Sequence, residues 1–154
     1  MIARAIQFIF VLLLLIGSAG TIRAGEPRLK KILPHLIDSK GRNSLYPSLY
    51  ERDAYQFFLR THPEQQAGLR FDVLWRGAHK NDPLRLRVEI RGMKNEIVRH
   101  ETLETELKKK GWFGQWSSIT LRDDAYKDFG EMTAWRVTLW DADQQVSEQK
   151  SFLW

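Results

Sequence analysis

Four arginines stand where a flat surface could bind an anion. Arg85, Arg87 and Arg91 recur at even spacings in the segment LRLRVEIR, and Arg136 lies in the later segment AWRVTLW. Even spacing places side chains on one face of an extended strand. If the two segments are neighbouring strands, the guanidinium groups line one sheet face beside Trp140, which adds a cation–π partner. The chemistry is recognition of an anionic glycan, a lipid head group or an acidic protein.

The same pattern also has a purely structural interpretation. Alternating charged residues are what any half-exposed strand needs. Glu89 and nearby carboxylates could neutralise the arginines. The sequence leaves a binding surface and a solvated sheet face both open.

A second candidate is the aromatic segment GWFGQW at 111–116. Trp112 and Phe113 lie between glycines and could form a stacking platform for sugar rings. Such residues also close the open end of a sandwich, and Trp116 fits the core better than a ligand contact. Trp112, Phe113 and Trp140 together define an alternative function, a carbohydrate-binding module.

Motifs for metal, nucleophilic or cofactor chemistry are poor. The chain has no cysteine, and its four histidines do not fall at metal-ligand spacings. Asp141 and Asp143, with Asp82, could chelate calcium, but a two-Asp hairpin usually serves turn chemistry. Ser147 and Lys150 match a Ser-x-x-Lys pattern, which needs a helix to bring its two groups together. No phosphate loop or dinucleotide fingerprint occurs. We expect no metal, no cofactor and no enzymatic activity.

The remaining residues must build the sheets that hold these side chains. Apolar alternation through 69–75, 84–91 and 132–141 predicts three half-buried strands. Weaker signals at 97–103 and 117–121, with turns every 8 to 12 residues or so, favour an all-β, antiparallel two-sheet sandwich. The alternation assigns to the core Leu69, Phe71, Val73, Trp75, Leu84, Leu86, Val88, Ile90, Ile119, Leu121, Trp135, Val137 and Leu139.

Residues 101–110 fit two secondary structures. A strand beginning at Ile97 can continue into them, but Glu104 and Lys108 are also four apart, as in a short helix. We favour a strand to about Leu103. Near 32–37, Pro34 lacks a backbone donor, so any strand there is an edge strand.

The last segment, 146–154, breaks the two-residue period. If Val146 faces the core, a bulge near Gln149 or Lys150 is needed before Phe152 and Trp154, which we expect to close the sandwich edge. A final aromatic also resembles the last strand of bacterial outer-membrane barrels. A small outer-membrane β-barrel is therefore a further alternative, although the helix described next has no place in it.

One short helix is expected at 49–61, before the second strand. Ser48 and Glu51 form a capping-box pattern, and Pro63 ends the helix. A single apolar stripe at helical spacing comprises Tyr50, Ala54, Phe57 and Phe58.

Residues 1–24 have the pattern of a secretory signal peptide. Arg4 precedes an apolar run at 8–16, and small residues follow at 17–20. Cleavage fits after Ala19 or after Ala24, which we favour; an uncleaved anchor would need an apolar run of about 20 residues. Residues 25–154 would then form one exported domain, periplasmic or extracellular, with no stable membrane span.

Charge and composition limit the classes of partner that can be expected. The 154 residues include 24 Lys plus Arg against 19 Asp plus Glu, a net charge of +5, and two of the basic residues lie in the leader. Nucleic-acid binders usually carry more positive charge, so no nucleic-acid partner is expected. The lack of cysteine excludes a disulfide framework.

The order of elements resembles an immunoglobulin-like or fibronectin type III-like domain. Trp75 closes the second strand in FDVLW, and the hairpin containing AWRVTLW comes last. The resemblance spans roughly 69–154 and implies fold alone. The chain departs from it by lacking the cysteine pair of immunoglobulin domains and by inserting the helix. The sequence thus predicts an exported, non-enzymatic immunoglobulin-like sandwich with a binding or accessory role, whose partner is a protein or an anionic or glycan ligand at the cell envelope.

Overall fold

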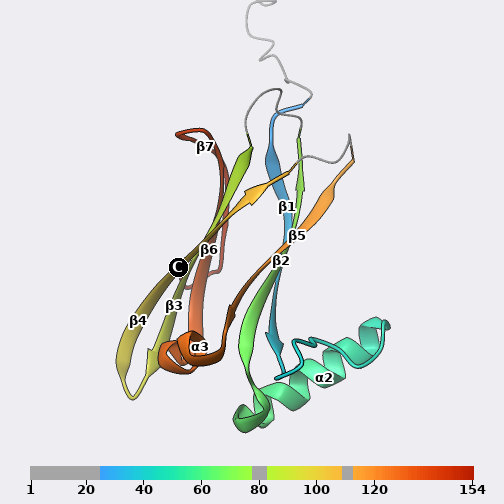
Figure 1. The fold of residues 1–154 in the computed structure, drawn as a ribbon, viewed down its shortest axis with the longest axis vertical. Helices are drawn as coiled ribbons and strands as arrows, with labels where there is room; N and C mark the ends of the chain where they lie inside the picture. The colour runs from blue at the N-terminus through green and yellow to red at the C-terminus, as the bar shows by residue number, and fades with distance from the viewer. Residues whose placement is uncertain (1–24, 78–82, 109–112) are drawn as a thin grey trace, which may run out of the picture.

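The computed structural model describes residues 25–77, 83–108 and 113–154. Within them, strands form two antiparallel sheets packed face to face, which confirms the predicted two-sheet sandwich (Figure 1). The three-stranded sheet has the order β1 (Arg28–Ile37), β2 (Gly68–Arg76), β5 (Gln115–Arg122). The four-stranded sheet has the order β4 (Ile97–Leu107), β3 (Leu84–Lys94), β6 (Glu131–Asp141), β7 (Gln144–Lys150).

The predicted leader, 1–24, lies outside the described residues. Among the helices of the described ranges, none has the length and apolar character needed to cross a membrane.

The two-residue alternation fixes which face of each strand is buried. On β3, Leu84, Leu86, Val88 and Ile90 are all at most 3% exposed, while the residues between them lie on the opposite face. Every predicted core residue packs in the cluster between the sheets, although Ile119 and Trp135 are only partly buried. The predicted core residues are therefore confirmed, while Leu29, Leu107, Tyr126 and Phe129 of the same cluster were not predicted.

Residues 101–107 are strand, so the helical alternative is wrong for them. β4 pairs with β3 along its whole length, from Lys94 opposite Ile97 to Leu84 opposite Leu107. Asn95 and Glu96 join the strands with φ angles of 51° and 63°, as a tight hairpin requires. Pairing along this hairpin carries the strand beyond the predicted limit at Leu103, and 109–110 lie outside the described residues.

The bulge in the last strand lies earlier than expected. Leu139 is opposite Ser147 and Trp140 is opposite Gln145, so Val146 is the extra residue rather than Gln149 or Lys150. Val146 then packs against the core, and the alternation of β7 is restored before the strand ends. The extra residue corrects the register as soon as the hairpin leaves its turn.

Helix α2 (Leu49–Thr61) begins and ends as predicted, and the Ser48 hydroxyl accepts a hydrogen bond from the Glu51 backbone N–H at 3.1 Å. Its apolar stripe, however, faces away from the sandwich. Tyr50 is 81% exposed and Phe57 is 66% exposed. The stripe of an isolated amphipathic helix normally faces the core, so this orientation needs a specific cause.

The cause is a polar contact with an edge strand. β1 lies at the edge of its sheet, as Pro34 predicted, which leaves backbone groups of Leu36 without a neighbouring strand. The buried side chain of Gln56 accepts a hydrogen bond from Leu36 N at 2.8 Å and donates one to Leu36 O at 2.9 Å. Gln56 therefore takes the place of a neighbouring strand and orients the helix with its apolar stripe facing away from the sandwich.

A buried carboxylate secures the segment that leads into α2. Asp38 accepts hydrogen bonds from the Arg42 backbone N–H and guanidinium and from the Tyr55 hydroxyl, each at 2.7 to 2.9 Å. Burial alone would raise the pKa of Asp38, but these hydrogen bonds outweigh it and hold the pKa at about 2, below its ordinary 3.8.

A second helix, α3 (Asp123–Phe129), connects β5 to β6. It closes the same end of the sandwich as α2 (Figure 1). Phe129 is 1% exposed, and its ring occupies the space beside Gly92 that a side chain would fill. The sequence pattern predicts no helix here, because seven residues are too few to show a clear helical period.

Gly92→Ala tests the packing of α3 on β3. A β-carbon at residue 92 would lie 2.6 Å from the Phe129 ring, so we expect the free energy of unfolding to fall by about 1–3 kcal/mol. Gly114→Ala is the control, because the closest atom to its β-carbon is the end of the flexible Leu74 side chain, at 3.1 Å, and the Trp75 carbonyl lies at an ordinary contact distance of 3.6 Å. Equal urea midpoints for the Gly92 variant and the wild type would contradict this packing.

Asp38→Asn tests the buried carboxylate. Because the pKa is lowered in the folded state, the ionised group stabilises the fold above pH 3.8 and loses this effect as pH falls toward 2. We expect the variant to lose about 2 kcal/mol at neutral pH and the difference to shrink through that window. Asp128→Asn, at an 84% exposed side chain, is the control. A difference that is constant with pH would refute the role given to ionised Asp38.

Candidate functional site

The four predicted arginines lie on the outer face of the four-stranded sheet. β3 and β6 are neighbours, with Arg85 opposite Trp140, Arg87 opposite Thr138 and Glu89 opposite Arg136. Since these residues alternate with the core residues, their side chains share the outward face. The structure thus brings together Arg85, Arg87, Arg91, Arg136 and Trp140. We call these five residues, together with Trp154 described in a later paragraph, the Arg–Trp face.

Tryptophan rings lie under all four guanidinium groups. Arg85 and Arg87 lie 5.8 and 5.0 Å from the centroid of the Trp140 ring. The Trp140 indole N–H donates to the Thr138 hydroxyl at 2.8 Å, which fixes the ring's orientation. The arrangement holds cations over aromatic faces, a contact worth about 0.5–2 kcal/mol according to exposure.

Trp154 is the site residue that sequence reasoning missed. We expected Phe152 and Trp154 to close the sandwich edge, but Phe152 is fully exposed at 101%. The chain turns at 151–154, and Trp154 lies 4.2 Å from Arg91 and 4.9 Å from Arg136. A two-residue period cannot predict this contact, because it forms after the strand has ended.

Two of the arginines are neutralised by carboxylates. Arg136 makes two hydrogen bonds of 2.8 Å to Glu89, and Arg87 pairs with Glu104 on β4. Two-pronged pairing of this kind is the strongest arginine–carboxylate geometry. This half of the face follows the structural interpretation of the sequence pattern.

The other two arginines lack such partners. Within the described residues, Arg85 and Arg91 make no ion pair, and the Nε atom of each is buried without a hydrogen-bond acceptor. A single contact of 3.4 Å joins the Arg85 guanidinium to the Ala142 carbonyl. A buried donor without an acceptor costs about 1–3 kcal/mol. The face therefore has two guanidinium groups that no carboxylate of the described residues neutralises.

The aromatic segment does not form one platform with Trp140. Trp112 lies outside the described residues, and Phe113, 87% exposed, precedes β5 of the other sheet. Trp116 is 53% exposed, so its expected place in the core is wrong. It pairs with Leu74 on the outer face of the three-stranded sheet, because the register puts the buried side of β5 at Ile119 and Leu121.

A polar cluster on the three-stranded sheet contains a histidine, an aspartate and a serine. Asp72 accepts a hydrogen bond from the Ser118 hydroxyl at 2.5 Å and lies 3.7 Å from Nε2 of the 7% exposed His35. A general base that activates a serine must lie between the serine and the carboxylate. Here the carboxylate lies in the middle, so the cluster does not have that geometry.

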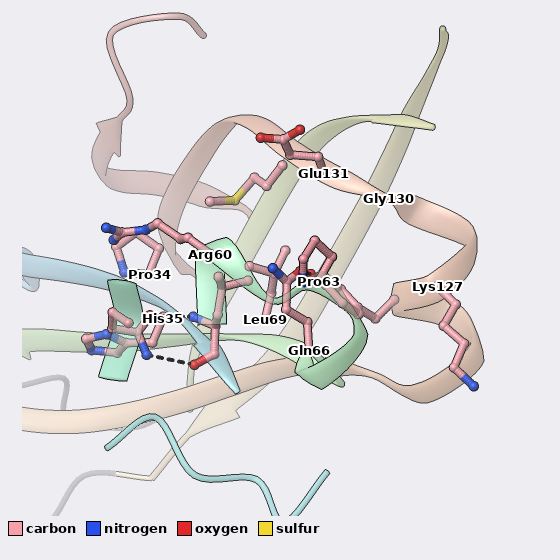
Figure 2. A pocket seen from close by; sticks show the side chains of 13 residues that line it. Pro34, His35, Arg60, Pro63, Gln66, Leu69, Lys127, Gly130 and Glu131 are labelled. Carbon is pink, nitrogen blue, oxygen red and sulfur yellow. Dashed lines mark hydrogen bonds between the residues drawn. The ribbon is translucent and has the colours of Figure 1, made fainter. Parts of the chain in front are cut away.

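A cleft of about 650 Å³ opens where β1, α2 and α3 meet (Figure 2). Arg60 and Lys127 lie on opposite sides of it, and apolar walls come from Pro34, Leu69 and Met132. Its amide and phenol groups already bind one another, since Tyr126 donates to Gln66 Oε1 at 2.5 Å and Gln66 donates to Leu59 O at 2.7 Å.

The described residues contain no group of three or more His, Asp or Glu side chains arranged to hold a metal ion. Asp82, the third residue of the possible calcium site, lies outside the described residues. No family model, curated protein or solved structure matches this chain.

His35→Gln tests the electrostatics of the polar cluster. Burial lowers the pKa of His35, and Asp72 only partly offsets that effect. The unfolded chain therefore binds a proton below about pH 6.5 more readily than the folded chain, so the free energy of unfolding should fall as pH drops through that value.

We expect His35→Gln to reduce this slope, measured by urea unfolding between pH 7 and pH 5 or so. His100→Gln, at an exposed position on β4, is the matched control. A slope unchanged in the His35 variant would contradict a neutral, buried His35.

Proposed function

We propose that this chain is an exported, non-enzymatic binding domain whose Arg–Trp face recognises a carboxylate-rich segment of a protein partner at the cell envelope. The observation that carries the proposal is the pair of arginines, Arg85 and Arg91, that lie over tryptophan rings with no carboxylate partner among the described residues. Two neighbouring arginines on the same face are already neutralised by Glu104 and Glu89.

The position of the two arginines favours binding. Both lie on β3, which has β4 on one side and β6 on the other, so their backbone is held by two hydrogen-bonded neighbours. Each side chain is also held by an indole ring, at 5.8 Å for Arg85 and 4.2 Å for Arg91. Groups that are already ordered lose less entropy on binding, so a given contact yields more affinity.

The chemistry favours an acidic partner over a neutral sugar. Stacking of a sugar needs an open aromatic face, and both rings of the Arg–Trp face already have guanidinium groups against them. Carboxylates accept hydrogen bonds in the geometry that guanidinium presents. Phe113 remains the exposed aromatic that would support the alternative carbohydrate-binding function.

We also propose that the sandwich has the immunoglobulin-like or fibronectin type III-like arrangement. In that family the fourth strand can join the sheet formed by the third, sixth and seventh strands. The order β4-β3-β6-β7 beside β1-β2-β5 supports the resemblance. Export is supported by the apolar run at 8–16 that follows Arg4.

Calorimetric titration with poly-L-glutamate tests the binding function. We expect saturable binding that weakens with added salt, and a loss of affinity of roughly 10-fold in Arg85→Gln and in Arg91→Gln. Glutamine keeps most of the side-chain stem, and thermal melts check that each variant is folded. Arg76→Gln, at an exposed position on β2 of the other sheet, removes the same charge as a matched control.

Two further titrations separate the partner classes. Polygalacturonate presents carboxylates on a sugar chain, and neutral dextran presents sugars alone. Stronger binding to polygalacturonate would replace the protein partner with an acidic glycan, and dextran binding that is lost in Phe113→Ser would favour the carbohydrate-binding alternative. An equal loss of poly-L-glutamate affinity in the Arg76 variant, or no binding to any probe, would refute the Arg–Trp face as the binding site.

A further inference from the structure

Helix α2 presents an apolar surface that nothing in the described chain covers. Its outward residues Leu49, Tyr50 and Phe57 are 68%, 81% and 66% exposed, and Leu45 and Tyr46 just before the helix are also exposed. Figure 1 shows α2 beside β1 at the end of the sandwich, away from the four-stranded sheet. Contiguous apolar surfaces on water-exposed elements usually mark an interface.

The inward side of the helix explains why this surface is left over. Leu59 is fully buried there, but the other inward contacts are polar: Gln56 binds the edge of β1, and the Tyr55 hydroxyl donates to Asp38 at 2.8 Å. The helix is thus held to the sandwich largely by hydrogen bonds. Its large apolar residues are available for another surface.

The exposed residues of α2, including Arg60 beside the cleft, repeat with a period of seven. A seven-residue repeat places equivalent residues on the same side of a helix, where a second helix can pack along them. The repeat consists of the small residues Ala54 and Thr61, the aromatic residues Tyr50 and Phe57, and the charged residues Asp53 and Arg60. The Thr61 hydroxyl bonds to backbone carbonyls of its own helix, at 3.0 and 3.1 Å, so its polar group is satisfied.

We propose that α2 is an interface with a second copy of this chain, in which the two α2 helices pack antiparallel. In this arrangement each Ala54 faces Phe57 of the other copy, and each Thr61 faces Tyr50. A small residue opposite a ring gives complementary packing. The same register places Asp53 of each copy opposite Arg60 of the other, so the contact repeats by two-fold symmetry.

The charges favour a second copy over a lipid surface. Helices that lie on membranes carry many basic residues on their polar face. The charged residues of α2 are Glu51, Arg52, Asp53 and Arg60, which sum to zero. The side chain of Asp53 is 72% exposed, and Arg60 is exposed with no ion pair in the described part of the chain, so both are accessible to a partner.

The length of α2 sets the expected strength of association between the two copies. Thirteen residues make between three and four turns, which gives a contact smaller than that of a permanent dimer. Association should therefore depend on concentration. Pairing of two copies would also present two Arg–Trp faces to one partner, which raises the apparent affinity without any new contact.

Sedimentation velocity over a concentration series tests the proposal with variants that reverse the charges at Asp53 and Arg60. The wild type should shift toward about twice the monomer mass as concentration rises. Asp53→Arg and Arg60→Asp should each weaken association by roughly 10-fold, because each places like charges opposite each other. The double variant should regain association, which loss of the Asp53–Arg52 contact at 3.1 Å within one chain would not explain.

Asp124→Arg makes the same charge change at a side chain that is 94% exposed on α3, and it should leave association unchanged. Phe57→Ser, at an exposed position, should abolish association without lowering the melting temperature. A wild type that stays monomeric, a double variant as weak as the single variants, or a monomer that binds phosphatidylglycerol vesicles through Phe57 would each overturn the proposal.

Discussion

The central constraint on this protein is that β3 must be apolar on one side and cationic on the other. Leu84, Leu86, Val88 and Ile90 hold the strand in the core, so the arginines between them can point only outward. Arg85 and Arg91 are thereby fixed at the centre of a sheet, against indole rings. A one-residue slip would bury the arginines, so the packing that stabilises the sandwich also determines which charged groups the outer face of β3 presents.

Some polar side chains of the fold have hydrogen-bond or ion-pair partners, and others have donors without an acceptor. Gln56 forms hydrogen bonds with the edge of β1, and Asp38 forms hydrogen bonds within the loop before α2, so both side chains stabilise the fold. The Glu89–Arg136 ion pair likewise stabilises the middle of the four-stranded sheet. Against this background, the buried Nε atoms of Arg85 and Arg91 are exceptional, because buried donors in proteins usually have acceptors.

Periodic features could be predicted from the sequence, and contacts between distant segments could not. The core set, the bounds of α2 and the Arg–Trp face except for Trp154 followed from periods of two and 3.6 residues. The outward orientation of α2 depends on Gln56 finding the edge of β1, and the role of Trp154 depends on a turn after β7. Trp116 was misplaced because a single tryptophan carries no information on register.

NMR of arginine side chains tests the central claim most directly. Poly-L-glutamate is titrated into ¹⁵N-labelled protein, and the Nε–H signals of Arg85 and Arg91 are followed, with that of Arg76 as the internal reference. The account predicts saturable shifts for Arg85 and Arg91 while Arg76 stays in place, because only the first two combine a fixed ring contact with a missing acceptor. Unchanged signals for both, or an equal shift of Arg76, would contradict it.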